Sequence, residues 1–407
     1  MARVAKIVVV VGAIRLGSLL FFLGMAFVAK SQSPDSTFTK KEIRKTTFEY
    51  LFSYYNQDGD HSAVTGGVGT EKLTVFLNRL NIVHTFDSAN TVLIEGGIDL
   101  ISSASTDNID FIVSSESAND NRLWVSVGYQ RDMKNNNQFG IQPTFSIESD
   151  YLSIGLGGWY KASNKNKNWR YGLGAYFYAD DLRWGRLDNE FRAPVTLVYP
   201  IELTDSAWFD IYMRYSTNIE FDVQHDINRR MSIGFFPGFI VQTGLLSTPF
   251  HRFYFDGADT AVVENLPRSR VKVPLGVQWN TFIGSRVVLQ LYYRFYWDDF
   301  GINANTVNPE VPIKVTPQLS ITPFVRWYSQ TAADYFYPYQ TAERGTPYYT
   351  SDYDLSQFTS FKVGGGIKFL TIKNMAFRQL SVRYAHYSRS DGLSFNQVSS
   401  YVNFATK

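Results

Sequence analysis

The stretch Arg286–Asp334, RVVLQLYYRFYWDDFGINANTVNPEVPIKVTPQLSITPFVRWYSQTAAD, repeats one two-residue pattern three times. Successive side chains of an extended chain point to opposite sides, so one face of the first repeat carries Val287, Leu289, Leu291, Tyr293 and Phe295. The other face is mostly polar, and the same alternation returns in 307–315 and 319–328. Each repeat is about a dozen residues long, roughly twice the usual strand length in soluble sheets.

Strand length indicates where the apolar face points. A tilted strand needs about 9 to 11 residues to cross the hydrocarbon of a membrane, and only a closed barrel leaves no unpaired backbone edge in lipid. Runs of this length recur along the chain. We therefore predict an all-β fold, a transmembrane antiparallel up-and-down β-barrel located in the cell outer membrane of a Gram-negative bacterium.

The number of strands follows from the alternating runs and the turns between them. We count about 18 strands, with 16 as the alternative because 230–256 is poorly delimited: 46–55, 71–86, 91–101, 122–132, 139–148, 152–161, 169–180, 191–203, 207–219, 230–245, 251–256, 270–282, 287–296, 306–315, 319–328, 358–370, 376–388 and 394–404. Proline cannot donate a ladder hydrogen bond, so bulges or shifted strand ends are predicted at Pro143, Pro194, Pro237, Pro274 and Pro323.

Loop lengths agree in part with this topology, because 149–150 and 392–393 would be short outer hairpins. If both termini lie on the periplasmic side, the connections after odd strands face outward, and they include the long ones at 56–70, 102–121, 257–269 and 330–357. The connections after even strands are short, as in known barrels of this kind.

The amino terminus is predicted to be an export signal. Residues 1–31 combine Arg3 and Lys6 with two apolar runs that are separated by Arg15, and end in small residues that suit cleavage before Gln32. A retained membrane helix is the alternative, but neither run reaches the ~20 residues of a span. Residues 32–45 would form a short periplasmic segment, and 46–407 the barrel. Without residues 1–31 the chain keeps 35 basic and 37 acidic residues, a net charge of −2 that argues against nucleic acid as a partner.

Several segments resemble a bacterial domain-of-unknown-function family of predicted outer-membrane barrels. They are Tyr54–Glu71 (YYNQDGDHSAVTGGVGTE), Asp99–Ser105 (DLISSAS), 292–303, 326–335 and Tyr349–Leu355 (YTSDYDL). The resemblance implies an exported barrel and brings no established activity. It also implies a small lipoprotein and a flavin-attaching enzyme as gene neighbours, so a lipoprotein or a periplasmic protein is a candidate partner besides membrane lipid.

The polar faces of the strands supply the candidate site. They place arginines and carboxylates toward the barrel interior, namely Arg170, Arg214, Arg294, Arg326, Arg383, Glu95, Asp99, Glu148, Glu202, Asp210 and Glu310. Such charges either line a water-filled pore and select solutes, or pair with each other and fill a narrow interior.

Aromatic residues gather at strand ends, which is typical of membrane-interface girdles, with a sugar-stacking platform as the alternative. A second aromatic group lies in the long loop 330–357, which is predicted to fold onto the mouth or into the lumen: Tyr335, Tyr337, Tyr339, Tyr348, Tyr349 and Tyr353. Asp352 of the same loop is a further candidate residue.

Signals for catalysis and metal binding are weak. The absence of cysteine excludes disulfides and thiolate metal sites, and the five histidines show no ligand spacing. His61-Ser62 lies in a glycine-rich loop, and Asp58-Gly59-Asp60 starts like a calcium loop but has Ala63 where the turn glycine belongs. We predict no enzyme, no cofactor and no metal.

Three functions remain open at this point. The first is a pore or an export or uptake conduit with a mixed-charge, arginine-containing lumen. The second is a closed barrel that anchors periplasmic or lipid-anchored proteins, and the third is an outer-membrane hydrolase that uses His61.

Overall fold

The computed structural model describes residues 44–103, 120–148, 152–182, 212–248, 251–371 and 377–405. The predicted signal peptide and most of the periplasmic segment lie outside this part of the chain, as do the predicted strand 191–203 and the carboxylates Glu202 and Asp210. No helix among the described residues is long and apolar enough to span a membrane.

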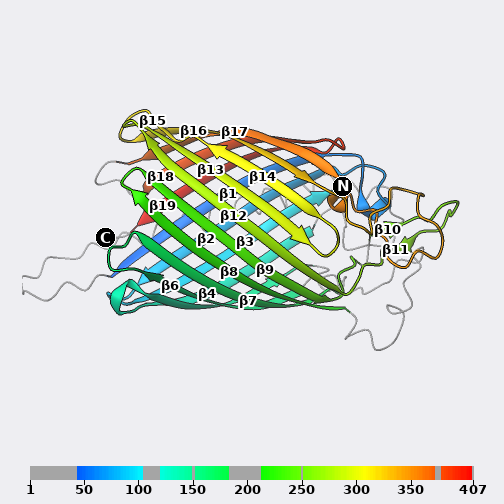
Figure 1. Cartoon of the computed structure of the whole chain (residues 1–407), viewed down its shortest axis with the longest axis horizontal. Helices are drawn as coiled ribbons and strands as arrows, with labels where there is room; N and C mark the ends of the chain where they lie inside the picture. Colours follow the sequence, from blue (N-terminus) through cyan, green and yellow to red (C-terminus); the bar gives the residue numbers. More distant parts are fainter. Residues whose placement is uncertain are drawn as a thin grey trace, which may run out of the picture.

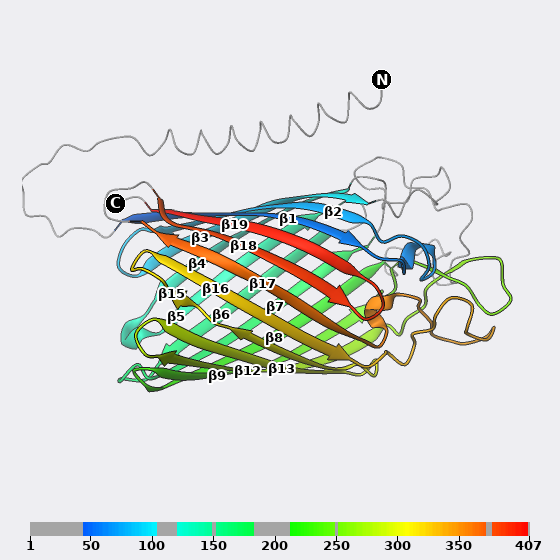
Figure 2. The same cartoon turned by 90° about the horizontal axis from the view of Figure 1, so that it is seen from above.

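The described residues form one antiparallel sheet that closes on itself. Nine strands follow one another from the amino-terminal side, β1 Lys45–Asp58, β2 Leu73–Thr85, β3 Asn90–Ser103, β4 Asp120–Asp132, β5 Gln138–Ile147, β6 Leu152–Ser163, β7 Trp169–Asp181, β8 Met213–Asn228 and β9 Met231–Gly244. The sheet continues through β12 Ser269–Ile283, β13 Val287–Asp298, β14 Asn303–Glu310, β15 Ile313–Lys314, β16 Leu319–Gln330, β17 Phe358–Leu370, β18 Phe377–Arg389 and β19 Ser394–Ala405. Closure is made by β1, which pairs with both β2 and β19. Figures 1 and 2 show the tilted strands wrapping around one axis.

The described part of the barrel has 16 strands around its circumference, the alternative of the two predicted counts. The short β15 does not add another, because it continues β14 and pairs with the same neighbours, β13 and β16. The predicted strand 251–256 is wrong, since only Arg252–Phe253 (β10) is extended there, and it pairs with Val262–Val263 (β11) outside the barrel. The predicted strand 191–203 lies outside the described residues, and the predicted strand 207–219 overlaps the start of β8, which pairs directly with β7.

The barrel exterior is apolar. Ile154, Leu156 and Ile367 are 58%, 52% and 55% exposed, and other large apolar side chains on the same face are exposed in the same way. An exposed apolar band on a closed barrel is typical of barrels whose outer face lies against acyl chains. The predicted outward direction of the apolar faces is therefore confirmed, and the sheet does not form two layers around a dry core.

Three long connections that lie wholly or mostly within the described residues, 59–72, 245–268 and 331–357, all follow odd-numbered positions among the 16 strands. They gather at the end where Figure 1 shows β10 and β11, here called the outer end, while 299–302 and 390–393 are short connections after odd positions. Two short 3-10 helices lie in these connections, η1 Ala63–Thr65 and η5 Tyr353–Leu355, and a third, η3 Lys134–Asn136, lies in a turn at the opposite end.

Candidate functional site

The strand register places the predicted interior charges on the face opposite the exposed apolar residues. The clearest sign that this face is concave is the ion pair between Arg383 on β18 and Glu310 on β14, whose Nη2 and Oε1 atoms are 3.0 Å apart. Two strands, β16 and β17, lie between them. Only an inward-curving wall brings side chains together across two strands. The same face carries Arg170, Arg214, Arg294, Arg326, Glu95 and Asp99.

Several of the predicted residues are paired with a neighbouring strand. Arg170 donates to both carboxylate oxygens of Asp226, at 2.6 and 2.9 Å. Arg214 donates to Asp180 at 2.9 Å. Farther along the sheet Arg79 contacts Glu95, Arg122 is 3.4 Å from Glu148, and Asp99 lies opposite Arg122 in the register. Along β2 to β8 each of these interior arginines therefore has a carboxylate beside it.

The wall formed by β16 and β17 is different. Arg326 and Lys362 are directly opposite each other in the register. The Lys362 ammonium donates to Gln397 Oε1 at 3.0 Å, and the Arg326 guanidinium lies 5.9 Å from the centre of the Tyr328 ring. Within the described ranges, no carboxylate is at ion-pair distance from either of them. Lys362 is not among the interior residues predicted from the sequence, although it alternates with the outward Phe361 and Val363 and so must face the interior.

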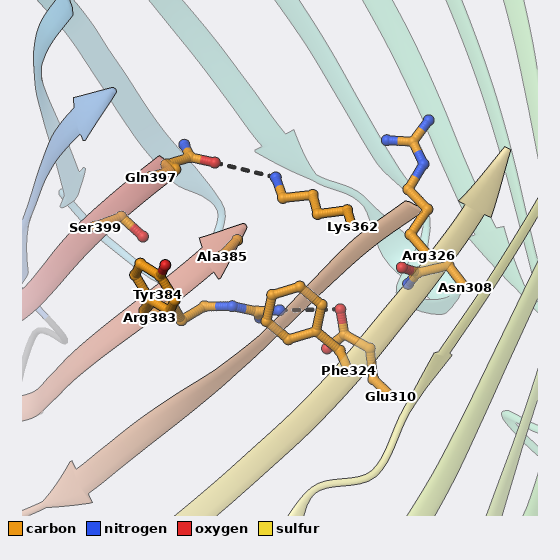
Figure 3. A pocket seen from close by; sticks show the side chains of 10 residues that line it. All are labelled: Asn308, Glu310, Phe324, Arg326, Lys362, Arg383, Tyr384, Ala385, Gln397 and Ser399. Carbon is orange, nitrogen blue, oxygen red and sulfur yellow. Dashed lines mark hydrogen bonds and ion pairs between the residues drawn. The ribbon is translucent and has the colours of Figure 1, made fainter. Parts of the chain in front are cut away.

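A cavity of about 240 Å³ opens in this wall. Its lining combines three basic side chains with one acidic one, and Figure 3 draws all ten residues: Asn308, Glu310, Phe324, Arg326, Lys362, Arg383, Tyr384, Ala385, Gln397 and Ser399. Arg383 lies over the Phe324 ring at 4.5 Å while it binds Glu310. One cation of the cavity is therefore already matched by a carboxylate.

Two glycines make the cavity possible. A Cβ atom on Gly364 would lie 2.6 Å from Phe324 Cζ, and one on Gly366 would lie 2.9 Å from Arg383 Cγ. Both distances are below any ordinary carbon–carbon contact. The Gly364-Gly365-Gly366 run thus allows Phe324 and Arg383 to lie flat against the inner wall.

Charge is distributed unevenly around the interior. On β12 to β18 the interior face carries more basic side chains than acidic ones. The acidic ones are Asp298 and Glu310, and the basic ones are Arg270, Lys272, Arg294, Arg326, Lys362, Lys368, Arg383 and Arg389. On β7 and β8 the interior face instead carries Asp180, Glu220, Asp222 and Asp226 with only Arg170 and Arg214. In the order of the closed sheet, β7 and β8 lie about half-way around from β18 and β19. The arrangement sets up an electric field across the lumen.

The long loops pack together at the outer end. Residues 251–266 and 331–356, here called the mouth cluster, are joined by backbone hydrogen bonds between Asn265 and Tyr349 at 2.8 and 3.0 Å. Phe253 is fully buried there and contacts Tyr349, with the ring centres 4.5 Å apart. Leu266 and Ala333 pack in the same buried group as Ala304 of β14, against the partly buried Tyr296 and Tyr328 of the inner wall. The loop with aromatic residues therefore folds onto the mouth of the barrel.

The predicted loop residues are spread through the mouth cluster. Tyr335 meets Phe300 edge to face at 5.2 Å, Tyr337 contacts Phe253, and Tyr339 contacts Tyr254 at 5.1 Å. Asp352 accepts a hydrogen bond from the Asp354 amide at 2.9 Å and so caps η5. These residues pack with the loops and are not gathered around one ligand-sized space.

Charged groups hold the mouth cluster together. Arg389 of β18, with 3% of its side chain exposed, is 2.6 Å from Asp354 and 2.7 Å from Asp391. The buried Glu264 accepts a hydrogen bond from Thr350 at 2.6 Å and lies 3.4 Å from His251 Nδ1. Burial raises the pKa of Asp352 to about 6, and the nearby Asp354 and Glu264 charges add to this while His251 opposes it.

The loop with His61 has a packing role. The His61 ring stacks on the Tyr353 ring, with the ring centres 3.8 Å apart. The His61 Nδ1 atom is 3.1 Å from the Gly67 carbonyl oxygen, and the His61 backbone N–H donates to Glu71. Burial raises the pKa of that glutamate. Within the described part of the chain, no group of three or more His, Asp or Glu side chains is placed to hold a metal ion.

Comparison with known proteins identifies a family. A family model described as "Protein of unknown function (DUF3570)" matches residues 88–401. No curated protein sequence matches this chain. Among solved structures, the outer membrane protein OpdK from Pseudomonas aeruginosa is 9% identical, with a TM-score of 0.42 over 89% of this chain and 98% of that chain.

Two other solved structures are similar to the same extent. A BenF-like porin from Pseudomonas fluorescens Pf-5 is 8% identical, with a TM-score of 0.44 over 88% of this chain and 98% of that chain. A bacterial polysaccharide outer membrane secretin is 9% identical, with a TM-score of 0.45 over 88% of this chain and 97% of that chain. Identities this low concern the fold alone.

Proposed function

We propose that this chain, a member of the DUF3570 family of proteins of unknown function, forms a water-filled pore across the outer membrane. Barrels with 16 to 18 strands enclose more space than their own side chains fill, and in porins this space is an aqueous channel. The proposal goes beyond the barrel fold itself, because it states that the interior is filled with water and open to solutes.

The observation that supports the pore most strongly is the way the interior charges are paired. Each interior ion pair of the described residues joins adjacent strands, or, in the case of Arg383 and Glu310, strands separated by two others. No such pair reaches across the barrel axis. A barrel closed by its own side chains would need contacts across that axis, because unpaired charges are costly to bury away from water.

Selectivity would come from the two unlike halves of the wall. The basic side of β12 to β18 attracts anions, and the acidic side of β7 and β8 attracts cations. The basic side carries the unmatched cations Arg326 and Lys362, so we expect a preference for anions. The mouth cluster covers part of the outer end and would limit the size of the solutes that enter.

Conductance in planar bilayers tests this proposal. The purified full-length protein should give discrete current steps, and Arg326→Ala and Arg294→Ala should each lower the ratio of anion to cation permeability. Lys165→Ala, in the turn between β6 and β7, removes the same charge outside the lumen and should change nothing. Flat traces together with a co-purifying protein would contradict the pore and favour the anchoring function.

A further inference from the structure

We infer that the cavity between β14 and β19 is a binding site for the carboxylate of small organic monoanions, with Lys362 and Arg326 as its main ligands. The inference rests on the proposed pore and names the class of solute that the pore would take. It begins from an arrangement that lacks a structural explanation, the two opposed cations.

Like charges placed directly opposite each other on neighbouring strands destabilise a sheet. Arg326 and Lys362 occupy such positions, and Lys362 also lies within electrostatic range of Arg383. The partners given to them by the described residues are neutral, the Gln397 amide oxygen and the Tyr328 ring. An anion bound beside them would turn this repulsion into attraction.

The cavity has the chemistry of a carboxylate site. An ammonium group and a planar guanidinium both form strong charge-assisted hydrogen bonds with carboxylates. Amide groups of Asn308 and Gln397 also line the cavity and supply further polar contacts. Figure 3 shows Lys362 and Arg326 extending from adjacent strands of the same wall, Lys362 toward Gln397 and Arg326 away from Gln397, with the Arg383–Glu310 pair nearby.

The same wall already holds one carboxylate. Glu310 accepts a hydrogen bond from Arg383 at 3.0 Å, while that guanidinium lies over Phe324. A solute carboxylate that binds Lys362 and Arg326 would interact with these two cations as the Glu310 carboxylate interacts with Arg383. Glu310 also favours a monoanion over a dianion such as phosphate, because its own charge repels the second negative charge more strongly.

Size and position fit the same class of ligand. A volume of about 240 Å³ is below the ~300 Å³ lower limit of pockets for drug-sized ligands, so the site suits a small acid. The acidic interior of β7 and β8 lies about half-way around the barrel and repels anions toward the basic wall. A passing carboxylate would therefore be concentrated where the cavity opens.

The test combines channel recordings with direct binding. In bilayers, sodium acetate added to a chloride solution should reduce the chloride current in a saturable way, and inorganic phosphate should do so less. Lys362→Gln and Arg326→Gln should each weaken the acetate effect about tenfold, the loss expected for one charge-assisted hydrogen bond. Lys362→Arg should restore most of it.

Lys368→Gln is the matched control. Lys368 lies on the same strand and the same interior face but outside the cavity, so its neutralisation should lower the general attraction of anions only and weaken the acetate effect much less than Lys362→Gln. If Lys368→Gln weakens the acetate effect as much as Lys362→Gln, the interior attracts anions only through its general charge and the site is refuted. Stronger inhibition by phosphate than by acetate would refute the monocarboxylate class.

Acetate binding to the detergent-solubilised protein, measured by ¹³C line broadening of labelled acetate, does not depend on conduction. Binding that is lost in Lys362→Gln, from a protein that shows no current, would disprove the pore and retain the site. Current steps without any acetate binding would retain the pore and disprove the site.

Discussion

Prolines inside the strands are tolerated without bulges. The sequence predicts bulges or shifted strand ends at these positions, but Pro143, Pro237, Pro274 and Pro323 all lie within their strands. Next to Pro237 the pairing of β8 with β9 runs from Glu220↔Gly238 to Val223↔Phe235 without a change of register. The ladder is interrupted for a short distance and then resumes, because the hydrogen bonds on either side keep the strands aligned. The fifth proline, Pro194, lies outside the described residues.

Gly364 provides a test at the level of a single residue. Gly364→Val should destabilise the barrel by ~1–3 kcal/mol, because the added carbon atoms would collide with the backbone carbonyl oxygen of Tyr384 and with the Phe324 ring. The temperature at which the folded band is lost on unheated electrophoresis gels should fall. Gly365→Val is the control, since Gly365 has open space at its Cβ position, and a loss of equal size there would contradict the explanation.

The elements that the sequence predicts best are the strands, and those it predicts worst are the outer loops. Residues 251–256 alternate like a strand, yet Phe253 is buried among the aromatic rings of the mouth cluster. β8 begins at Met213 and extends to Asn228, nine residues beyond the predicted end at 219. The additional residues include Asp222 and Asp226, whose polar character resembles that of a loop until the interior of a barrel provides them with partners.

The mouth cluster should respond to pH through Asp352. Its pKa is raised to about 6, so the folded cluster binds this proton more tightly than the unfolded chain does. That contribution is complete below pH ~4, the usual range of an aspartate, and is lost as the pH rises through 6. Protease cleavage within 331–357 should therefore become faster between pH 5 and 7.5.

Asp352→Asn is the matched variant for this pH effect. Asparagine keeps the oxygen that accepts the Asp354 N–H, but it does not titrate. The variant should show little change in cleavage between pH 5 and 7.5. The neighbouring Glu264 acts outside this range, because its His251 and hydrogen-bond partners hold its pKa below the ordinary value despite its burial. An unchanged pH profile in the variant would exclude Asp352 as the cause.

At the scale of the whole molecule, closure explains the behaviour expected in detergent. Every barrel strand is hydrogen-bonded on both sides, so no edge is free to start unfolding. We expect the protein to migrate as a compact band in sodium dodecyl sulfate without heating and to move to a different position after boiling. A single position under both conditions would contradict a closed membrane barrel.

Neutralising charges on the acidic side and on the basic side of the interior should change the anion preference in opposite directions. The double variant Glu220→Gln/Asp222→Asn removes negative charge from the acidic side and should raise the anion preference of the pore. Arg294→Gln, on the basic side, should lower it. Both changes should shift the reversal potential in a salt gradient by some millivolts. Shifts in the same direction for the two variants would contradict the assignment of an acidic and a basic side.

The sequence alone determined the class of fold and the direction of the apolar faces, and it placed some of the interior charges, Arg294, Arg326 and Arg383 among them, on the polar faces of the strands. These depend on the two-residue period, a local property that any extended chain displays. Only the tertiary structure decided the number of strands and the partners of the interior charges. Whether Arg383 meets Glu310, or Arg326 stands opposite Lys362, depends on the register and curvature of strands far apart in the chain. Register and curvature arise when the whole sheet closes, and no single stretch of sequence contains them.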